Sequence, residues 1–110
     1  MKLPHADRAW VDKAKLTQYL LAEEHPAGGA KARFFLRNGF SRDRWDDLAN
    51  RLVDHGRQHE VAEIRHRPGG RLFAITGSWR CADGALRPVT TVWLLADGSD
   101  APRLVTAYPE

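Results

Sequence analysis

The spacing of apolar residues along the chain changes period at Gly56. Before Gly56, apolar side chains recur every three or four positions, as on one face of an α-helix. After it, they alternate with polar side chains, as in a half-buried β-strand. The pattern therefore predicts a helical half followed by a β half. Because helices segregated from a run of strands are typical of the α+β class, we expect the helices to pack on one face of a sheet.

Three helices are predicted in the first half, over residues 13–22, 30–38 and 42–55. Asp12 and Ser41 precede the first and the third, and both residue types cap helices by accepting a backbone N–H. His25 is expected to lie beyond the first helix, because a residue before proline avoids helical angles. Gly39 stands where a left-handed cap ends the second helix, and Gly56 is expected to end the third.

Four strands are predicted in the second half, over residues 61–67, 72–80, 88–95 and 103–108. The connections between them are short and carry Pro-Gly-Gly or Asp-Gly turn signals. Short connections join antiparallel neighbours, so the expected fold is α+β, with about three N-terminal helices on one face of a four-stranded antiparallel meander. In the last strand, strict alternation places Arg103, Val105 and Ala107 on one face and Leu104, Thr106 and Tyr108 on the other.

The composition fits a single domain over residues 1–110. Hydrophobic residues make up 43% of the chain and charged residues 28%, as in folded globular proteins. Cys81 is the single cysteine, which excludes an intramolecular disulfide framework and a cysteine-based zinc site. The sequence shows no leader peptide and no run of 18 apolar residues, so we expect a cytoplasmic protein without a membrane segment.

The charge is modest, with a net value of +3, but it is carried mainly by arginine. There are 13 arginines and 4 lysines. The planar guanidinium binds phosphate and carboxylate groups in a bidentate manner, so this bias is compatible with a phosphate-bearing partner. An arginine-rich composition also follows from a GC-rich genome, and the two explanations stay open.

The most distinctive local feature is the pair Gly28 and Gly29, which precedes Lys31. Glycines at a helix N-terminus expose backbone N–H groups that suit an anion, and Lys31 would neutralise a bound phosphate. The spacing differs from that of a P-loop, and a tight turn between two helices explains the same residues. His25 has two interpretations as well, a turn residue before proline or a general acid or base near Lys31.

The remaining candidate residues lie in the strands. Thr91 and Thr106 suit a strand by β-propensity alone, yet a sheet face with threonine, arginine and tyrosine is also a candidate phosphodiester site. The four tryptophans are best interpreted as core residues, although one exposed beside arginines would favour base stacking. The five histidines show no metal-ligand spacing, and no cofactor motif is present, so neither a metal nor a cofactor is expected.

Several segments together resemble a known family. They are "MKLPHADRAWVD" at the start, "HPAGGAKARFF" with "NGF" in the centre, and "TVWLL" and "PRLVTAYP" in the last strands. The chain resembles, over its whole length, a bacterial domain family of unknown function. Members of that family occur alone or at the C-termini of polymorphic-toxin and haemagglutinin-like proteins.

The resemblance implies a function through a further similarity of fold. The order of helices and strands is similar to that of the barnase/EndoU/colicin/RelE ribonucleases, which cleave RNA without a metal by activating a ribose 2′-OH. The matching residues here are His25, Lys31, Thr91, Arg103, Thr106 and Tyr108. His25 would act as acid or base, Lys31 and Arg103 would bind phosphate, and the others would orient the scissile group.

The partners implied are RNA and a small cognate inhibitor protein. An alternative from a different class is a non-catalytic module that binds a small partner protein. A small-molecule-binding protein is a third interpretation, with no motif behind it.

Overall fold

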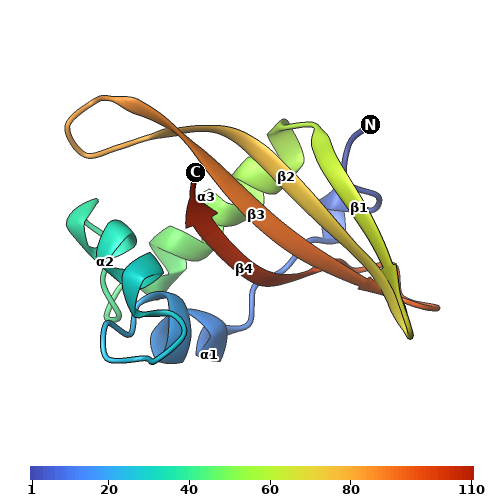
Figure 1. Cartoon of the computed structure of the whole chain (residues 1–110), viewed down its shortest axis with the longest axis horizontal. Helices are drawn as coiled ribbons and strands as arrows, with labels where there is room; N and C mark the ends of the chain where they lie inside the picture. Colours follow the sequence, from blue (N-terminus) through green and yellow to red (C-terminus); the bar gives the residue numbers. More distant parts are fainter.

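The computed structural model describes residues 1–110 and confirms the α+β fold (Figure 1). The helical part comprises η1 (Ala6–Arg8), α1 (Lys13–Lys15), the π-helical turn η2 (Leu16–Leu20), α2 (Gly29–Arg37) and α3 (Trp45–Gln58). The strands are β1 (Val61–Arg67), β2 (Gly70–Arg80), β3 (Leu86–Ala96) and β4 (Arg103–Pro109). They form one sheet in the order β1-β2-β3-β4, with antiparallel pairing throughout, as expected of a meander.

The helix boundaries agree with the sequence in part. Asp12 caps α1 as predicted, because its side chain accepts a hydrogen bond from the N–H of Ala14 at 3.1 Å. Gly39 adopts a φ of +93° just after α2, which is the conformation predicted for it. Ser41 does not cap α3, since that helix begins at Trp45. Gly56 lies inside α3 and does not end it; a Cβ there would lie 2.7 Å from the indole of Trp93, so close packing explains this glycine.

The core lies between the helices and one face of the sheet, which we call the covered face. In Figure 1, α3 lies behind the strands, while α1 and α2 gather at the β4 side. The strands contribute Phe73, Ile75, Trp79 and Trp93 to this face, each at most 2% exposed. The fully buried apolar residues from the helices are Leu16, Leu20, Ala32, Phe35, Leu48 and Leu52. The opposite face of the sheet, which we call the open face, has no helix packed on it (Figure 1).

A β-bulge in β4 changes which side chains share a face. Thr106 pairs with Val92, and Leu104 pairs with Trp93, the next residue of β3, so Val105 is an extra residue in β4. Such a bulge interrupts the alternation of side chains. Leu104 accordingly lies with Trp93 on the covered face, while Arg103, which pairs with Leu94, lies on the open face. The prediction of strict alternation was wrong here, and the bulge places Arg103 on the same face as Thr106 and Tyr108.

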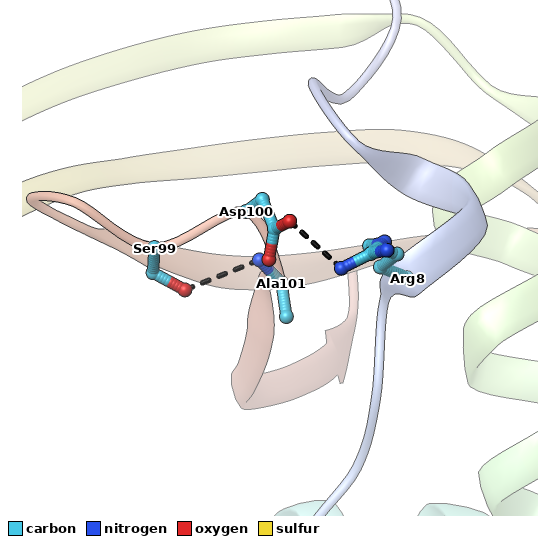
Figure 2. Close-up of polar contacts among 4 residues, drawn as sticks. All are labelled: Arg8, Ser99, Asp100 and Ala101. Atoms are coloured by element: carbon cyan, nitrogen blue, oxygen red, sulfur yellow. Dashed lines mark hydrogen bonds and ion pairs between the residues drawn. The ribbon is translucent and has the colours of Figure 1, made fainter.

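The N-terminal segment runs beside β4. The N–H of Trp10 donates to the carbonyl of Pro102, and the N–H of Leu104 donates to the carbonyl of Trp10, both at 3.0 Å. These bonds make a parallel bridge between Trp10 and Arg103. Figure 2 shows a further tie, in which the guanidinium of Arg8 lies 2.7 Å from a carboxylate oxygen of Asp100. The edge of β4 is therefore partly covered by main chain from the start of the protein.

No helix in the structure combines the length and the apolar character needed to span a bilayer.

Candidate functional site

A polar cluster lies where η2 and α2 meet the end of the sheet. The Nζ of Lys31 donates to the hydroxyl of Tyr19 at 2.8 Å and to the hydroxyl of Thr106 at 3.0 Å. The two hydroxyls are themselves 3.2 Å apart. The ammonium also lies 5.6 Å from the ring centroid of Tyr108, within the range of a cation–π interaction. Three elements, η2, α2 and β4, thus position one lysine among two hydroxyls and an aromatic ring.

Tyr19 is the member of this cluster whose ionisation is perturbed. Burial of its phenol by itself raises the pKa, because it penalises the charged form. The hydrogen bonds to Lys31 and Thr106, with the positive charges of Lys31 and Lys15, outweigh burial and hold the pKa of Tyr19 below its ordinary value of 10.0. The phenolate of Tyr19 is therefore formed at a lower pH than that of a free tyrosine.

His25 packs against Tyr19, with ring centroids 5.0 Å apart and an edge-to-face angle of 77°. Its Nδ1 accepts hydrogen bonds from the backbone N–H groups of Ala27 and Gly28, both at 3.0 Å. An imidazole whose Nδ1 accepts carries its proton on Nε2. His25 in this geometry is a hydrogen-bond donor through Nε2 and has no free lone pair to act as a base.

Two hollows meet at the cluster. One is a groove of about 240 Å³ on the open face, lined by Glu63, Arg65, Leu72, Ala74, Val92, Thr106 and Tyr108. The other has about 480 Å³ and is lined by Asp12, Ala14, Lys15, Gln18, Tyr19, His25 and Arg103. Because Thr106 lines the first and Tyr19 lines the second, their contact with Lys31 lies at the boundary between the two hollows.

Both hollows carry basic side chains. The second contains Lys15 and Arg103, and the first contains Arg65, which also pairs with Glu63. Lys31 lies between them. In the first hollow Glu63 balances Arg65, whereas in the second Lys15 and Arg103 outnumber Asp12. The second hollow and the adjoining Lys31 therefore form the part of this surface that suits a phosphate.

Comparison with known proteins gives a family and a fold. The family model described as "Domain of unknown function (DUF6883)" matches residues 2–110. The chain belongs to this family. The membership confirms the expectation of a domain family of unknown function that the motifs of this sequence had raised. No curated protein matches the sequence of this DUF6883 domain.

A solved structure is similar to this DUF6883 domain over nearly its whole length. It is a chain of a contact-dependent growth inhibition toxin–immunity protein complex from Klebsiella pneumoniae 342. The TM-score is 0.68, the sequence identity is 16%, and the match covers 96% of this chain and 97% of the other. At that identity the likeness establishes a shared fold.

Five of the six predicted catalytic residues gather around Tyr19. Lys31 and Thr106 contact it directly, and Tyr108 is a neighbour of Lys31. His25 packs on the Tyr19 ring and lines the same hollow as Arg103. The bulge at Val105 matters for this outcome, because regular alternation would have turned Arg103 away from Thr106.

Thr91 lies apart from the others, on the covered face, and is fully buried. Its hydroxyl accepts a hydrogen bond from Nε1 of Trp93 at 2.9 Å and lies 3.0 Å from Nδ1 of His55. The Nε2 of His55 lies 2.9 Å from the carbonyl of Val89, which identifies Nε2 as the donor and Nδ1 as the acceptor. Thr91 therefore joins α3 to the sheet through a satisfied buried network and has no access to either hollow.

Gly28 and Gly29 do not form the expected phosphate cradle. The N–H of Gly28 donates to His25 Nδ1, and the N–H of Gly29 donates to the carbonyl of His25 at 2.9 Å. Both donors are therefore already used within the turn. A Cβ at Gly28 would lie 2.5 Å from the Tyr19 ring, and one at Gly29 would lie 2.5 Å from the carbonyl oxygen of Glu23. Close packing around Tyr19 is the role that the structure gives these glycines.

Sequence reasoning missed Tyr19 as a candidate site residue. The helical spacing of Leu16, Tyr19 and Leu20 assigned all three to the core, and Tyr19 is indeed packed against it. A tyrosine on an apolar stripe needs a partner for its hydroxyl, and that need was the available signal. The sequence does not reveal that the partner is Lys31.

No three His, Cys, Asp or Glu side chains lie close enough together to hold a metal ion.

Proposed function

We propose that this domain is a toxin-like ribonuclease that cleaves RNA by attack of a ribose 2′-OH on the adjacent phosphate, without a metal ion. The contact of Lys31 with both Tyr19 and Thr106, where the groove on the open face meets the basic hollow of Lys15 and Arg103, carries this proposal. The proposal keeps His25, Lys31, Arg103, Thr106 and Tyr108 as site residues and adds Tyr19. Thr91 is left out because it is buried on the covered face.

Tyr19 and Lys31 supply the proton transfers in this scheme. The phenolate of Tyr19, favoured by its lowered pKa, accepts the proton of the 2′-OH. The O2′–P bond forms and the P–O5′ bond breaks, which leaves a 2′,3′-cyclic phosphate. The departing O5′ takes a proton from the ammonium of Lys31. A proton then passes from the Tyr19 hydroxyl to the Lys31 amine across their 2.8 Å hydrogen bond, which restores the starting state.

The other site residues bind the phosphate and orient it. Arg103 offers a planar set of donors to phosphate oxygens, and the Nε2–H of His25 adds a neutral donor in the same hollow. Thr106 holds the Lys31 ammonium at 3.0 Å and fixes its direction. Donors that are held in place before the charge develops stabilise the phosphorane more than mobile ones, because they need not reorganise during the reaction.

The test is incubation of the purified protein with total RNA in EDTA. We expect the wild type to cut RNA to products that end in 2′,3′-cyclic phosphate. Tyr19→Phe removes the proton acceptor, and Lys31→Met removes both the acid and the charge. Each change is expected to lower the cleavage rate by about 10²-fold or more, as is usual for a lost acid or base.

Lys13→Met is the matched control for Lys31→Met, because Lys13 lies over the ring of Trp45, outside both hollows. It should cut RNA at the wild-type rate. Intact RNA with the wild type, or equal cleavage by wild type, Tyr19→Phe and Lys31→Met, would refute the proposal. Thermal melting of each variant shows whether a loss of cleavage reflects a loss of fold.

A second candidate function is a non-catalytic module that binds a small partner protein. The observation that favours it is the structural similarity to a chain of a toxin–immunity protein complex. The RNA assay separates the two functions. A domain that leaves RNA intact, yet forms a stable complex with a small protein encoded beside it in analytical ultracentrifugation, is the interaction module.

A further inference from the structure

One tryptophan of the four is exposed, and its main chain pairs with Arg103, a residue of the candidate site. Trp10 is 44% exposed, whereas Trp79 is 2% and Trp93 is 0% exposed. An exposed indole on the surface of a protein that handles nucleic acid is a stacking platform, because every base presents a π-face.

The backbone holds Trp10 in a fixed place. Its N–H and its carbonyl are both hydrogen bonded at 3.0 Å to the segment that begins β4. Residues that form a bridge in a sheet direct their side chains to the same side. Trp10 is bridged to Arg103, and Arg103 lies on the open-face side because of the bulge at Val105. The indole is therefore held at the edge of the sheet, on the same side as the guanidinium.

Arg103 connects this indole to the candidate cleavage site. It lines the hollow that also contains Tyr19 and His25, and that hollow continues to the Lys31 cluster. Arg103 and Thr106 lie on the same side of β4, on either side of the bulge. Their partners in β3, Leu94 and Val92, are two positions apart, so the main chain at Arg103 and at Thr106 is separated by about 7 Å. A phosphate at Arg103 would therefore leave its own nucleoside within reach of Trp10 while the next phosphate lies toward Thr106 and Lys31.

We infer that Trp10 and Arg103 form a binding site for an unpaired nucleotide that flanks the scissile phosphate, with the base stacked on Trp10 and a phosphate on Arg103. This inference rests on the proposed ribonuclease function and narrows its substrate class to RNA that is single-stranded at the cleavage point. A base inside a duplex is already stacked on its neighbours and has no free face for an indole.

The experiment measures binding without cleavage. A fluorescently labelled DNA 12-mer, which lacks the 2′-OH, is titrated with protein at low salt as a single strand and as a duplex, and anisotropy is followed. Trp10→Ala should weaken single-strand binding by roughly 5- to 150-fold, the range for loss of one stacked base. Trp10→Phe should retain most of the affinity, since an aromatic face remains. Duplex binding should change by less than about twofold in both variants.

Leu86→Ala is the matched control. Leu86 is 58% exposed but lies at the opposite end of β3 from Leu94, the partner of Arg103. Its removal takes away exposed apolar surface and should leave single-strand affinity unchanged. Thermal melting of Trp10→Ala is expected to stay close to the wild type, because the bonds that hold residue 10 are made by the main chain.

The outcomes separate this inference from the proposed function. Three results would overturn the stacking site. Trp10→Ala could bind single strands as tightly as the wild type, it could lose as much affinity for the duplex as for the single strand, or the wild type could fail to bind single strands. If the wild type still cuts RNA in those cases, the ribonuclease proposal stands alone. Binding that depends on Trp10, together with intact RNA in EDTA, would instead support the stacking site and refute the ribonuclease.

Discussion

Lys31 shows how the surroundings of one residue decide what its side chain does. A lysine in the first turn of a helix is ordinarily a solvated charge, and the Gly28-Gly29 pair before it suggested a helix terminus that binds an anion. The structure instead directs the ammonium sideways, onto the hydroxyls of Tyr19 and Thr106. The positive charge of Lys31 favours the phenolate of Tyr19, and this helps to lower the pKa of Tyr19.

Gly28→Ala tests whether RNA cleavage depends on the packing around Tyr19. The φ of Gly28 is −102°, so alanine is accepted by the backbone, but its Cβ would lie 2.5 Å from a carbon of the Tyr19 ring. The ring must shift and loosen its contact with Lys31. We expect a large loss of RNA cleavage together with a loss of about 1–3 kcal/mol of unfolding free energy, because the ring also packs against the core.

Gly29→Ala is the comparison, because its Cβ meets the carbonyl oxygen of Glu23, which is main chain and yields less easily. It should cost about 1–3 kcal/mol of unfolding free energy, measured by urea denaturation. Full cleavage activity in Gly28→Ala would contradict the role given to Tyr19.

At the scale of elements, the sequence predicted the sheet better than the site. The switch from helical spacing to alternation identifies a helical half and four strands, since each element needs one apolar face. The bulge at Val105 leaves no such trace, because "RLVTAYP" alternates acceptably with or without an extra residue. Only the pairing with β3 reveals it. The contact of Tyr19 with Lys31 and Thr106 was equally hidden, since it joins residues up to 87 positions apart.

The stability of the protein is expected to depend on pH, because His55 is buried where α3 meets the sheet. Burial, followed by the nearby His59, holds the pKa of His55 below its ordinary value of 6.5, despite hydrogen bonds that raise it. The folded protein therefore keeps His55 neutral at a pH where the unfolded chain binds a proton. The free energy of unfolding that neutral His55 contributes is fully present above pH 6.5. It is lost as the pH falls below 6.5, at up to about 1.4 kcal/mol per pH unit.

Urea denaturation between pH 8 and pH 5 measures this effect. His55→Gln is expected to be less stable at pH 8, because it disturbs the network with Thr91 and Val89, and to show a weaker dependence on pH. A variant with the wild-type slope would show that other groups cause it.

At the scale of the whole molecule, the two faces of the sheet have different tasks. The covered face holds the core against α3, and the open face, with the β4 edge, carries the two hollows, of which the one with Lys15 and Arg103 is basic. A net charge of +3 is too small for strong nonspecific attraction of RNA, so binding should depend on the few cations at the hollows.

The salt dependence of binding tests this division. For a single strand, each phosphate contact contributes about −0.7 to the slope of log affinity against log salt concentration. Arg103→Gln should therefore weaken binding of the DNA single strand and make the slope shallower by about 0.7. Arg44→Gln removes an exposed arginine near the start of α3 and should leave both quantities unchanged. Equal effects of the two changes would mean that binding is spread over the surface.

The bulge at Val105 also sets how relatives of this chain should be compared. In a regular strand, every second residue lies on the same face. A comparison that assumes this alternation would place Arg103 on the opposite face from Thr106 and Tyr108. Here the site residues follow a spacing of three and then two, at positions 103, 106 and 108. Loss of the extra residue would keep all three on the open face while it shortened the main chain between Arg103 and Thr106 by one residue. A one-residue gap in this strand of a relative is therefore expected to alter the span between phosphate contacts and to leave the orientation of the side chains intact.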